Sequence, residues 1–205
     1  MKYPNFREEK KLWRNDYKIV VGIDEVGRGP LAASVVAAAV CFKNGRGQFS
    51  SILIKDSKKL TPKKREEIYE ILKKNPNIEW GIGRVSEKVI DRINILEATK
   101  LAMKRAVRIL EKKCSNADFL LIDGNFGINM DIAQKSIIKA DEKVFSCAAA
   151  SIIAKVTRDR MMLKYHKKYP QYAFDKHKGY PTKLHRQIIK QRGFCKIHRK
   201  SFRVS

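Results

Sequence analysis

Five short apolar segments, interleaved with helical segments, predict an α/β fold in which helices flank a five-stranded sheet. The length of 205 residues is typical of one compact domain with an appended lobe. A chain of that length buries roughly 70% of its unfolded surface, so a hydrophobic core suffices without disulfide bonds. The four cysteines form no CxxC pair, which favours reduced thiols over a zinc site.

The first two strands are expected near the start of the chain. Residues 18–24 (KIVVGID) form a short apolar run of β type, and the turn signal at residues 27–30 (GRGP) ends it. Residues 34–42 (SVVAAAVCF) form a second apolar run, which predicts a buried strand. A glycine-containing turn is expected after it, at residues 43–48.

A helix and a third strand come next. Thr61 is a good N-cap residue and Pro62 suits the first helical position, so we expect a helix at residues 63–74. A loosely alternating segment at residues 78–85 predicts the third strand.

A longer helix and two more strands follow. Asn94 and Glu97 have the spacing of a capping box and predict a helix that ends near Lys113. The apolar segment at residues 119–122 (FLLI) predicts a strand, and residues 136–139 predict another. Three early strands and two later ones therefore make up the sheet.

The C-terminal part is expected to be helical and basic. Residues 145–165 predict a long helix, and residues 182–192 predict a last one. Residues 155–205 are rich in Lys and Arg and contain only two acids. We expect a core at residues 1–160 and a basic helical extension at residues 161–205, which packs on the core as one structural unit.

The basic excess predicts a polyanionic partner. Lys and Arg total 45 against 21 acids, which gives a formal net charge of +24. Nucleic acid is the natural partner of such a chain, and an ordinary lysine-rich surface is the alternative interpretation. The N-terminal residues are charged, and the longest apolar stretch, residues 31–42, is too short to span a bilayer. These features predict a cytoplasmic protein that does not enter a membrane.

Four acids stand at or just beyond the ends of predicted strands: Asp24, Glu25, Asp123 and Asp141. Loops that follow strands commonly carry the sites of α/β proteins. Carboxylates gathered there repel one another unless a hard cation such as Mg²⁺ or Mn²⁺ binds between them. Two such ions can clamp the attacking and leaving oxygens of a phosphodiester displacement.

Each acid also has a simpler interpretation as a solvated turn residue or a helix cap. Glu142 is the main rival of Asp141 for the fourth position. Adjacent strand residues face opposite sides of a sheet, so Glu25 joins Asp24 only if the chain bends there or if Glu25 offers its carbonyl oxygen.

Several sequence blocks resemble those of the ribonuclease HII family and stand in the family's order. The first block, GIDEVGRGP, covers residues 22–30. The others are DSKKL (56–60), DGN (123–125), KAD (139–141), AAASIIAKVTRDR (148–160), HKGYPT (177–182) and HRKSF (198–202). Together they span nearly the whole chain, so the resemblance is specific.

The resemblance implies a ribonuclease H-like five-stranded mixed sheet, a catalytic core at residues 1–160 and a C-terminal helical extension. It implies a monomeric endonuclease that hydrolyses the RNA strand of RNA–DNA hybrids and cuts at single ribonucleotides in duplex DNA. The residues Asp24, Glu25, Asp123 and Asp141 would be catalytic and would bind two divalent ions, Mg²⁺ or Mn²⁺. Two-metal in-line hydrolysis would leave 5′-phosphate and 3′-hydroxyl ends.

The family also implies which residues bind the substrate. The Gly27-Arg28-Gly29 loop would read the ribose 2′-hydroxyl, the group that distinguishes RNA from DNA. Tyr180 would sense the junction between RNA and DNA, and its alternative role is that of a core tyrosine. Lys58 and Lys59 would bind a phosphate, and their alternative role is that of solvated lysines.

The sequence departs from the family pattern at two places and leaves other functions open. Ala33-Ser34 stands where the family usually has Gly-Pro, which bears on the turn before the second strand, and Cys195-Lys196 stands where small or proline residues are favoured. The alternatives are another nuclease of the same fold, such as a resolvase or an exonuclease, and a non-catalytic nucleic-acid-binding protein. The preferred metal and any partner of the replication-clamp type are left open.

Overall fold

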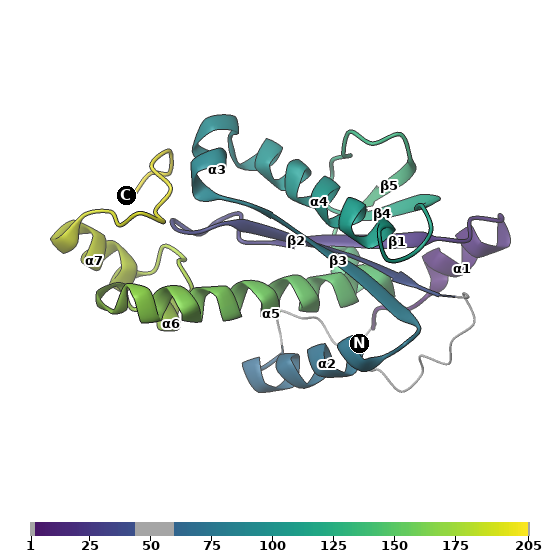
Figure 1. The fold of residues 1–205 in the computed structure, drawn as a ribbon, viewed down its shortest axis with the longest axis horizontal. Coiled ribbons are helices and arrows are strands. Elements are labelled where there is room, and N and C mark those ends of the chain that lie inside the picture. Colours follow the sequence, from purple (N-terminus) through teal and green to yellow (C-terminus); the bar gives the residue numbers. More distant parts are fainter. Residues whose placement is uncertain (1–2, 44–59, 205) are drawn as a thin grey trace.

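The computed structural model describes residues 3–43 and 60–204, and its centre is one five-stranded sheet (Figure 1). The strand order is β3-β2-β1-β4-β5. The first three strands pair antiparallel, whereas β1, β4 and β5 run parallel to one another, so the sheet is mixed. This confirms the predicted fold class. The strands are β1 (Val20–Val26), β2 (Val35–Phe42), β3 (Ile78–Val85), β4 (Phe119–Asp123) and β5 (Ala133–Ile137).

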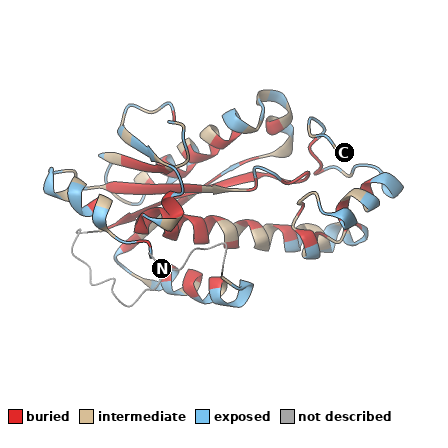
Figure 2. Cartoon of the chain, turned by 180° about the vertical axis from the view of Figure 1, so that it is seen from behind, coloured by how far each residue is buried: buried red, intermediate tan, exposed pale blue. Residues whose placement is uncertain are grey.

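Two long helices cover the two faces of the sheet (Figure 1). Helix α4 (Ile95–Glu111) packs on β3 and β2, and helix α5 (Phe145–Lys168) packs on β1 and β2. Strand β2 is consequently buried along its whole length (Figure 2). The remaining helices are α1 (Arg7–Arg14), α2 (Pro62–Lys74), α3 (Glu87–Ile93), α6 (Phe174–His177), α7 (Lys183–Arg192) and the 3₁₀ helices η1 (Ala140–Glu142) and η2 (Pro170–Tyr172).

Glycines let both helices touch the strand backbone directly. A Cβ atom at Gly22 of β1 would overlap Ser146 at the start of α5, and one at Gly83 of β3 would overlap the carbonyl of Ala102 in α4. The first contact seats the start of α5 against β1. Asp24 lies two residues beyond Gly22 on the same face, so this seating also brings α5 alongside the candidate site.

Side-chain caps begin the helices where the sequence predicts them. The Thr61 hydroxyl accepts a hydrogen bond from the Lys64 amide, and the Asn94 side chain accepts from the amides of Leu96 and Glu97. Asn94 has a positive φ of 66°, and this turn separates α4 from α3. The short helices α1, α3 and α6 have no counterpart in the sequence-based prediction.

The predicted bounds of the last strand are wrong, because β5 starts and ends earlier than residues 136–139. Parallel pairing with β4 aligns Ala133 with Phe119 and Ile137 with Asp123. Lys139 adopts a left-handed conformation with φ at 56°, which ends the extended backbone. The strand lies at the edge of the sheet and its sequence, AQKSI, has no apolar alternation to indicate its register.

Helix α5 leads from the sheet into the C-terminal part without a break and ends at Lys168, beyond the predicted end at residue 165. Beyond this helix, Tyr172 and Phe174 pack on Ala32 and Ala33, which precede β2. We propose that residues 161–205 are an extension of the core at residues 1–160 within one structural unit.

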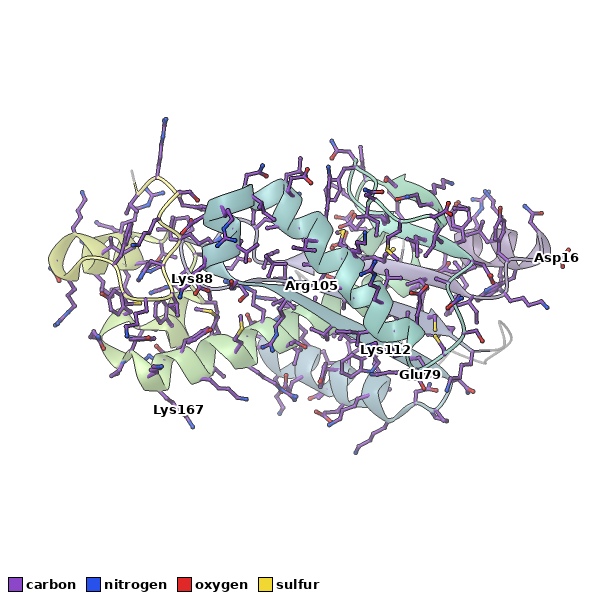
Figure 3. The ribbon with its side chains drawn as sticks, turned by 45° about the horizontal axis from the view of Figure 1, so that its top comes forward. Asp16, Glu79, Lys88, Arg105, Lys112 and Lys167 are labelled. Atoms are coloured by element: carbon purple, nitrogen blue, oxygen red, sulfur yellow. The ribbon has the colours of Figure 1, made fainter. Side chains whose placement is uncertain are left out.

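Basic side chains project from several sides of the molecule (Figure 3). Arg105 and Lys112 lie on α4, whereas Lys167 projects near the C-terminal end of α5. In the described residues, no helix combines the length and the apolar character that crossing a membrane requires. Most of the predicted turn at 43–48, together with Lys58 and Lys59, lies outside the described residues.

Candidate active site

Three aspartates meet where β1 and β4 end side by side. Asp24, Asp123 and Asp141 each offer a carboxylate oxygen, and these oxygens all lie within 4.8 Å of one another. The parallel pairing of β1 with β4 brings the first two together, and Asp141 comes from η1. The carboxylate of Asp123 accepts a hydrogen bond of 2.7 Å from the Ala140 amide, which fixes η1 against the end of β4.

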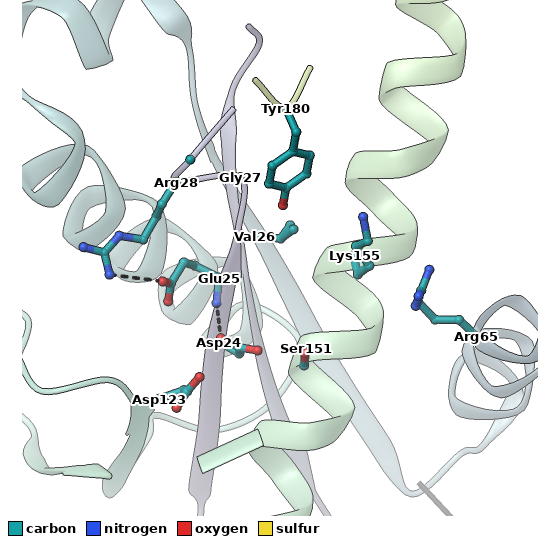
Figure 4. A pocket seen from close by; sticks show the side chains of 11 residues that line it. Asp24, Glu25, Val26, Gly27, Arg28, Arg65, Asp123, Ser151, Lys155 and Tyr180 are labelled. Atoms are coloured by element: carbon teal, nitrogen blue, oxygen red, sulfur yellow. Dashed lines mark hydrogen bonds and ion pairs between the residues drawn. The ribbon is translucent and has the colours of Figure 1, made fainter. Parts of the chain in front are cut away.

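Glu25 lines the same pocket from a strand whose pairing is unbroken. β1 stays paired with β2 through Val26, and the side chain of Glu25 lies beside Asp24 but is not one of the three clustered carboxylates. Its amide donates to Asp24 Oδ1 at 2.7 Å, and its Oε1 lies 3.5 Å from Arg28 Nη1 (Figure 4). Its Oε2 is buried and has no hydrogen-bond partner among the described residues.

The carboxylates of the site are held in an environment that opposes their charge. Burial, followed by the charges of Glu25 and Asp123, raises the pKa of Asp24 well above its ordinary value. Burial also raises the pKa of Glu25 to about 7, against the opposing effect of Arg28. A cation that binds between these groups would relieve both effects.

The donors in this cluster fit a hard divalent cation. The cluster supplies carboxylate oxygens only, which suits Mg²⁺ or Mn²⁺ and not a metal that prefers sulfur or imidazole. Asp24, Asp123 and Asp141 would hold such an ion, and the buried Oε2 of Glu25 is a further oxygen without a partner among the described residues. Glu142, the rival of Asp141, instead lies 3.8 Å from Lys139 and outside the cluster.

Asp24, Glu25 and Asp123 open onto a pocket of about 410 Å³ that also contains the Gly27–Gly29 loop and Tyr180, whereas Asp141 is fully buried (Figure 4). The Gly27-Arg28-Gly29 loop forms part of its wall, and Tyr180 directs its hydroxyl group into it. The Tyr180 ring lies 5.8 Å from Lys155 Nζ and 5.7 Å from the guanidinium carbon of Arg158. The alternative of a core tyrosine does not fit, because Tyr180 is partly exposed in the pocket.

Three further polar residues of the pocket were not predicted from the sequence: Arg65, Ser151 and Lys155. Ser151 and Lys155 are one helical turn apart on α5, and that spacing is the signal that could have identified them. Ser151 donates a hydrogen bond that lowers the pKa of Asp24, against the larger effect of burial. Asp159 pairs with Lys155 at 2.8 Å within α5 and lies outside the aspartate cluster.

The histidines do not form an acid–base pair in this pocket. His177, His185 and His198 lie together in the C-terminal part, and none of them lines the pocket. Burial lowers the pKa of His185 and that of His198 to about 4, which leaves both rings neutral at physiological pH. A ribonuclease mechanism that uses a pair of histidines as general acid and base therefore has no support from this geometry.

A mixed sheet of this order with clustered carboxylates at adjacent strand ends defines a metal-dependent nuclease of the ribonuclease H type. The family model for ribonuclease HII matches residues 21–205. The chain is 50% identical to ribonuclease HII of Syntrophus aciditrophicus over 196 residues, covering 96% of this chain and 89% of that one. It is 50% identical to ribonuclease HII of Chlamydia trachomatis serovar A over 200 residues, covering 95% and 89%. The chain belongs to the ribonuclease HII family.

Solved structures agree with this assignment. Ribonuclease H2 from Pyrococcus horikoshii superimposes with a TM-score of 0.72 at 28% identity, covering 91% of this chain and 94% of that one. Ribonuclease HII from Archaeoglobus fulgidus, solved in complex with PCNA, gives 0.75 at 25% identity, covering 91% and 96%. The protein is thus a metal-dependent ribonuclease H with endonuclease activity.

Proposed function

We propose that this ribonuclease H hydrolyses the RNA strand of RNA–DNA hybrids and also cuts at single ribonucleotides embedded in duplex DNA. The observation that carries the proposal is that one pocket combines Asp24 and Asp123 of the aspartate cluster with the Gly27–Gly29 loop and Tyr180. Acids and metal alone would serve any phosphodiester. Selectivity needs groups that meet the 2′-hydroxyl and its neighbouring nucleotide, and the loop and the tyrosine provide them.

In this proposal the acids act as the ligands of two divalent ions, Mg²⁺ or Mn²⁺. When bound, the ions supply the charge that stabilises an in-line displacement at phosphorus, which leaves 5′-phosphate and 3′-hydroxyl ends. Asp24, Asp123 and Asp141 hold the ions and Glu25 adds an oxygen from the neighbouring position. The Ala140 amide, bonded to Asp123, keeps one carboxylate oriented.

The loop and the tyrosine bind the substrate in this proposal. Gly27 has φ at 95°, a conformation that glycine adopts without strain, so the backbone of the loop can approach a ribose closely. Arg28, bonded to Glu25 and half exposed, is placed to meet the adjacent phosphate. The Tyr180 ring offers a flat surface to the sugar or base beyond the junction.

Membership of the family sets the alternatives aside. A resolvase or an exonuclease would not need a loop that reads the 2′-hydroxyl. A non-catalytic binding protein would not gather carboxylates in its nucleic-acid pocket, since they repel phosphate. We propose further that the enzyme is a cytoplasmic monomer. Complex formation with PCNA is a property of the Archaeoglobus protein.

The experiment is cleavage of a DNA duplex that carries one ribonucleotide, with and without Mg²⁺ or Mn²⁺, beside a long RNA–DNA hybrid. We expect metal-dependent cutting of both substrates, with 5′-phosphate and 3′-hydroxyl ends in the mass spectrum. Asp24→Asn should abolish cutting and leave the melting temperature and the duplex affinity largely unchanged. Products with 2′,3′-cyclic phosphate ends, or full activity of Asp24→Asn, would refute the mechanism.

A further inference from the structure

Arg158 and Arg199 are charged side chains that are completely buried. A buried arginine usually pairs with a carboxylate, because removing its charge from water costs several kcal/mol. Here the six hydrogen bonds that the two guanidinium groups make all go to main-chain carbonyl oxygens of the described residues. Burial lowers the pKa of both groups.

Arg199 binds the main chain of the Gly27–Gly29 loop. Its Nη2 donates to the Gly27 carbonyl at 2.6 Å and its Nη1 to the Arg28 carbonyl at 2.9 Å. Its Nε donates to the Ala33 carbonyl at 2.9 Å. One guanidinium group therefore fixes two of the three peptide units of the loop together with the turn that precedes β2.

Arg158, on α5, ties the same turn to the segment that carries the tyrosine. Its Nε and Nη2 donate to the carbonyls of Ser34 and Ala32 at 3.2 and 3.1 Å. Its Nη1 donates to the carbonyl of Lys178 at 3.0 Å, two residues before Tyr180. A main-chain bond of 2.8 Å from the Leu31 amide to the Gly179 carbonyl joins the two segments directly.

The two arginines also meet at Gly27. A Cβ atom there would overlap the Nε atom of Arg158, so the absence of a side chain at Gly27 lets the guanidinium group lie against the loop. The face of Tyr180 lies over the same guanidinium group, at 5.7 Å. Arg158 thus contacts both the loop and the tyrosine.

Only arginine has the geometry that this arrangement needs. Its planar fork presents five N–H donors in fixed directions, whereas the ammonium group of lysine is a point charge that cannot reach three separated carbonyls. A charged donor also forms stronger hydrogen bonds with carbonyl oxygens than a neutral one does. A lysine would therefore keep the charge and lose the geometry.

We propose that Arg158 and Arg199 are positioning residues that hold the Gly27–Gly29 loop and Tyr180 at a fixed separation. This separation makes the enzyme selective for a ribonucleotide next to a deoxyribonucleotide. The inference rests on the proposed function, because it concerns how the two substrate-reading parts of that pocket are held in register.

The experiment compares Arg158→Lys and Arg199→Lys with wild type on the single-ribonucleotide duplex and on the long hybrid. Displacing a reading group by about 1 Å can cost on the order of 100-fold in rate. We expect the ratio of kcat/KM on the duplex to kcat/KM on the hybrid to fall by at least about 10-fold in both variants, because the hybrid offers many registers and the duplex only one. Arg160→Lys is the matched control, since Arg160 lies on the same helix, pairs with Glu66 and Glu70, and should leave the ratio unchanged.

Equal losses on both substrates, or an unchanged ratio, would show a merely structural role and overturn the inference alone. Wild-type enzyme that ignored the single ribonucleotide would overturn the proposed function and the inference with it. Hydrogen exchange on the wild type tests the same inference without any variant, so the test also works if a variant does not fold. The amides of Leu31 and Ala33, bonded to the carbonyls of Gly179 and Ile197, should exchange as slowly as those of β1. Exchange as fast as in an exposed turn would contradict a fixed loop.

Discussion

Ala33 adopts a backbone conformation that alanine seldom takes. Its φ is 68°, in the left-handed region, at one of the two positions where the sequence replaces the usual Gly-Pro of the family. Its amide donates to the Ile197 carbonyl, and its own carbonyl accepts from Arg199. These two bonds to the C-terminal segment hold Ala33 in this conformation.

Ala33→Gly should leave the free energy of unfolding within about 0.5 kcal/mol of wild type. Relief of a left-handed alanine gives about 1–2 kcal/mol. Loss of a buried methyl group costs about 0.8 kcal/mol, and the added freedom of the unfolded chain costs about 0.4–1 kcal/mol. Ala32→Gly is the control, because Ala32 is equally buried and has no positive φ. It should lose about 1–2 kcal/mol in chemical denaturation, from the same two costs. Equal losses in the two variants would show that Ala33 carries no strain.

Tyr180→Ala should reduce cleavage at a single embedded ribonucleotide more than cleavage of a long hybrid. Removal of a stacking contact costs about 1–3 kcal/mol, or roughly 5- to 150-fold in rate. The measurement is the ratio of cleavage rates on the two substrates under the same metal and salt. Tyr180→Phe keeps the ring and should stay near wild type if stacking dominates. A ratio that does not change in Tyr180→Ala would show that the junction is read elsewhere.

The sequence makes some of these side chains predictable and hides others for a physical reason. Asp24 and Asp123 are visible because an apolar strand that runs straight into an acid is unusual. Arg158 and Arg199 are hidden because arginine is mostly solvated, and a basic C-terminal segment gives no sign that two of its charges are buried. The position of Tyr180 in the pocket is likewise not visible from the residues next to it in the sequence.

Helix α5 begins shortly after Asp141, and Glu9, a residue near the N-terminus, caps its first turn. Its N-cap residue, Val144, offers no side-chain hydrogen bond. Glu9 of α1 instead accepts bonds of 2.8 Å from both the amide and the hydroxyl of Ser146. The side chain of Glu9 is fully buried, and its Oε2 has no partner among the described residues.

The difference in stability between wild type and Glu9→Gln should depend on pH. Burial raises the pKa of the Glu9 carboxyl in the folded protein. The folded protein therefore keeps this proton at pH values where the unfolded chain, whose glutamates have the ordinary pKa of 4.5, has released it. The wild type therefore loses stability as the pH rises from the unfolded pKa through the folded one, and Glu9→Gln does not. The free energy of unfolding of the variant minus that of the wild type should therefore increase as the pH is raised from 4 to 8.

Glu8→Gln is the matched control for this prediction. The hydrogen bond with Lys135 lowers the pKa of Glu8, so its contribution to stability is present above the unfolded pKa and is lost as the pH falls. The pH dependence of the difference should therefore have the opposite sign. Curves of the same sign for the two variants would contradict the role given to burial at Glu9.

Local signals set the elements that could be predicted, and distant contacts set the others. Thr61 and Asn94 predict the starts of α2 and α4, because each capping hydrogen bond spans only two or three residues. The hydrogen bond from the Ser146 amide to Glu9 joins residues 137 positions apart, so no local sequence pattern predicts this cap of α5. The bounds of β5 follow from pairing with β4 at the edge of the sheet, and not from its own polar sequence.

Basic side chains lie on different elements of the fold. α7 starts at Lys183, three residues after Tyr180, and carries Lys183, Arg186, Lys190 and Arg192. Lys112 lies on α4, which packs on the opposite face of the sheet from α5. We expect nucleic-acid binding to depend on the basic side chains of α7 and not on Lys112 of α4.

The affinity for a hybrid duplex should fall steeply with salt, by about 0.9 log units per log unit of salt for each phosphate neutralised. Lys183→Gln should weaken binding and reduce this slope by about 1, whereas Lys112→Gln should leave it unchanged. Binding is measured by fluorescence anisotropy with the inactive Asp24→Asn variant at several salt concentrations. A flat salt dependence would count against the C-terminal extension as the binding surface.

The hydrogen bonds of Arg199 also determine when the site is completed during folding. They join residues that are 166 to 172 positions apart in the chain. Closing so large a loop is slow, and contacts between distant segments form late in folding. The pairing of β1 with β4, which brings Asp24 and Asp123 together, joins residues 99 positions apart, from Val20 to Phe119, so it closes a smaller loop and can form earlier. A refolding chain should thus regain its helical circular dichroism before it regains selectivity for RNA, and a folding intermediate would hold the acids together without being able to recognise a ribose.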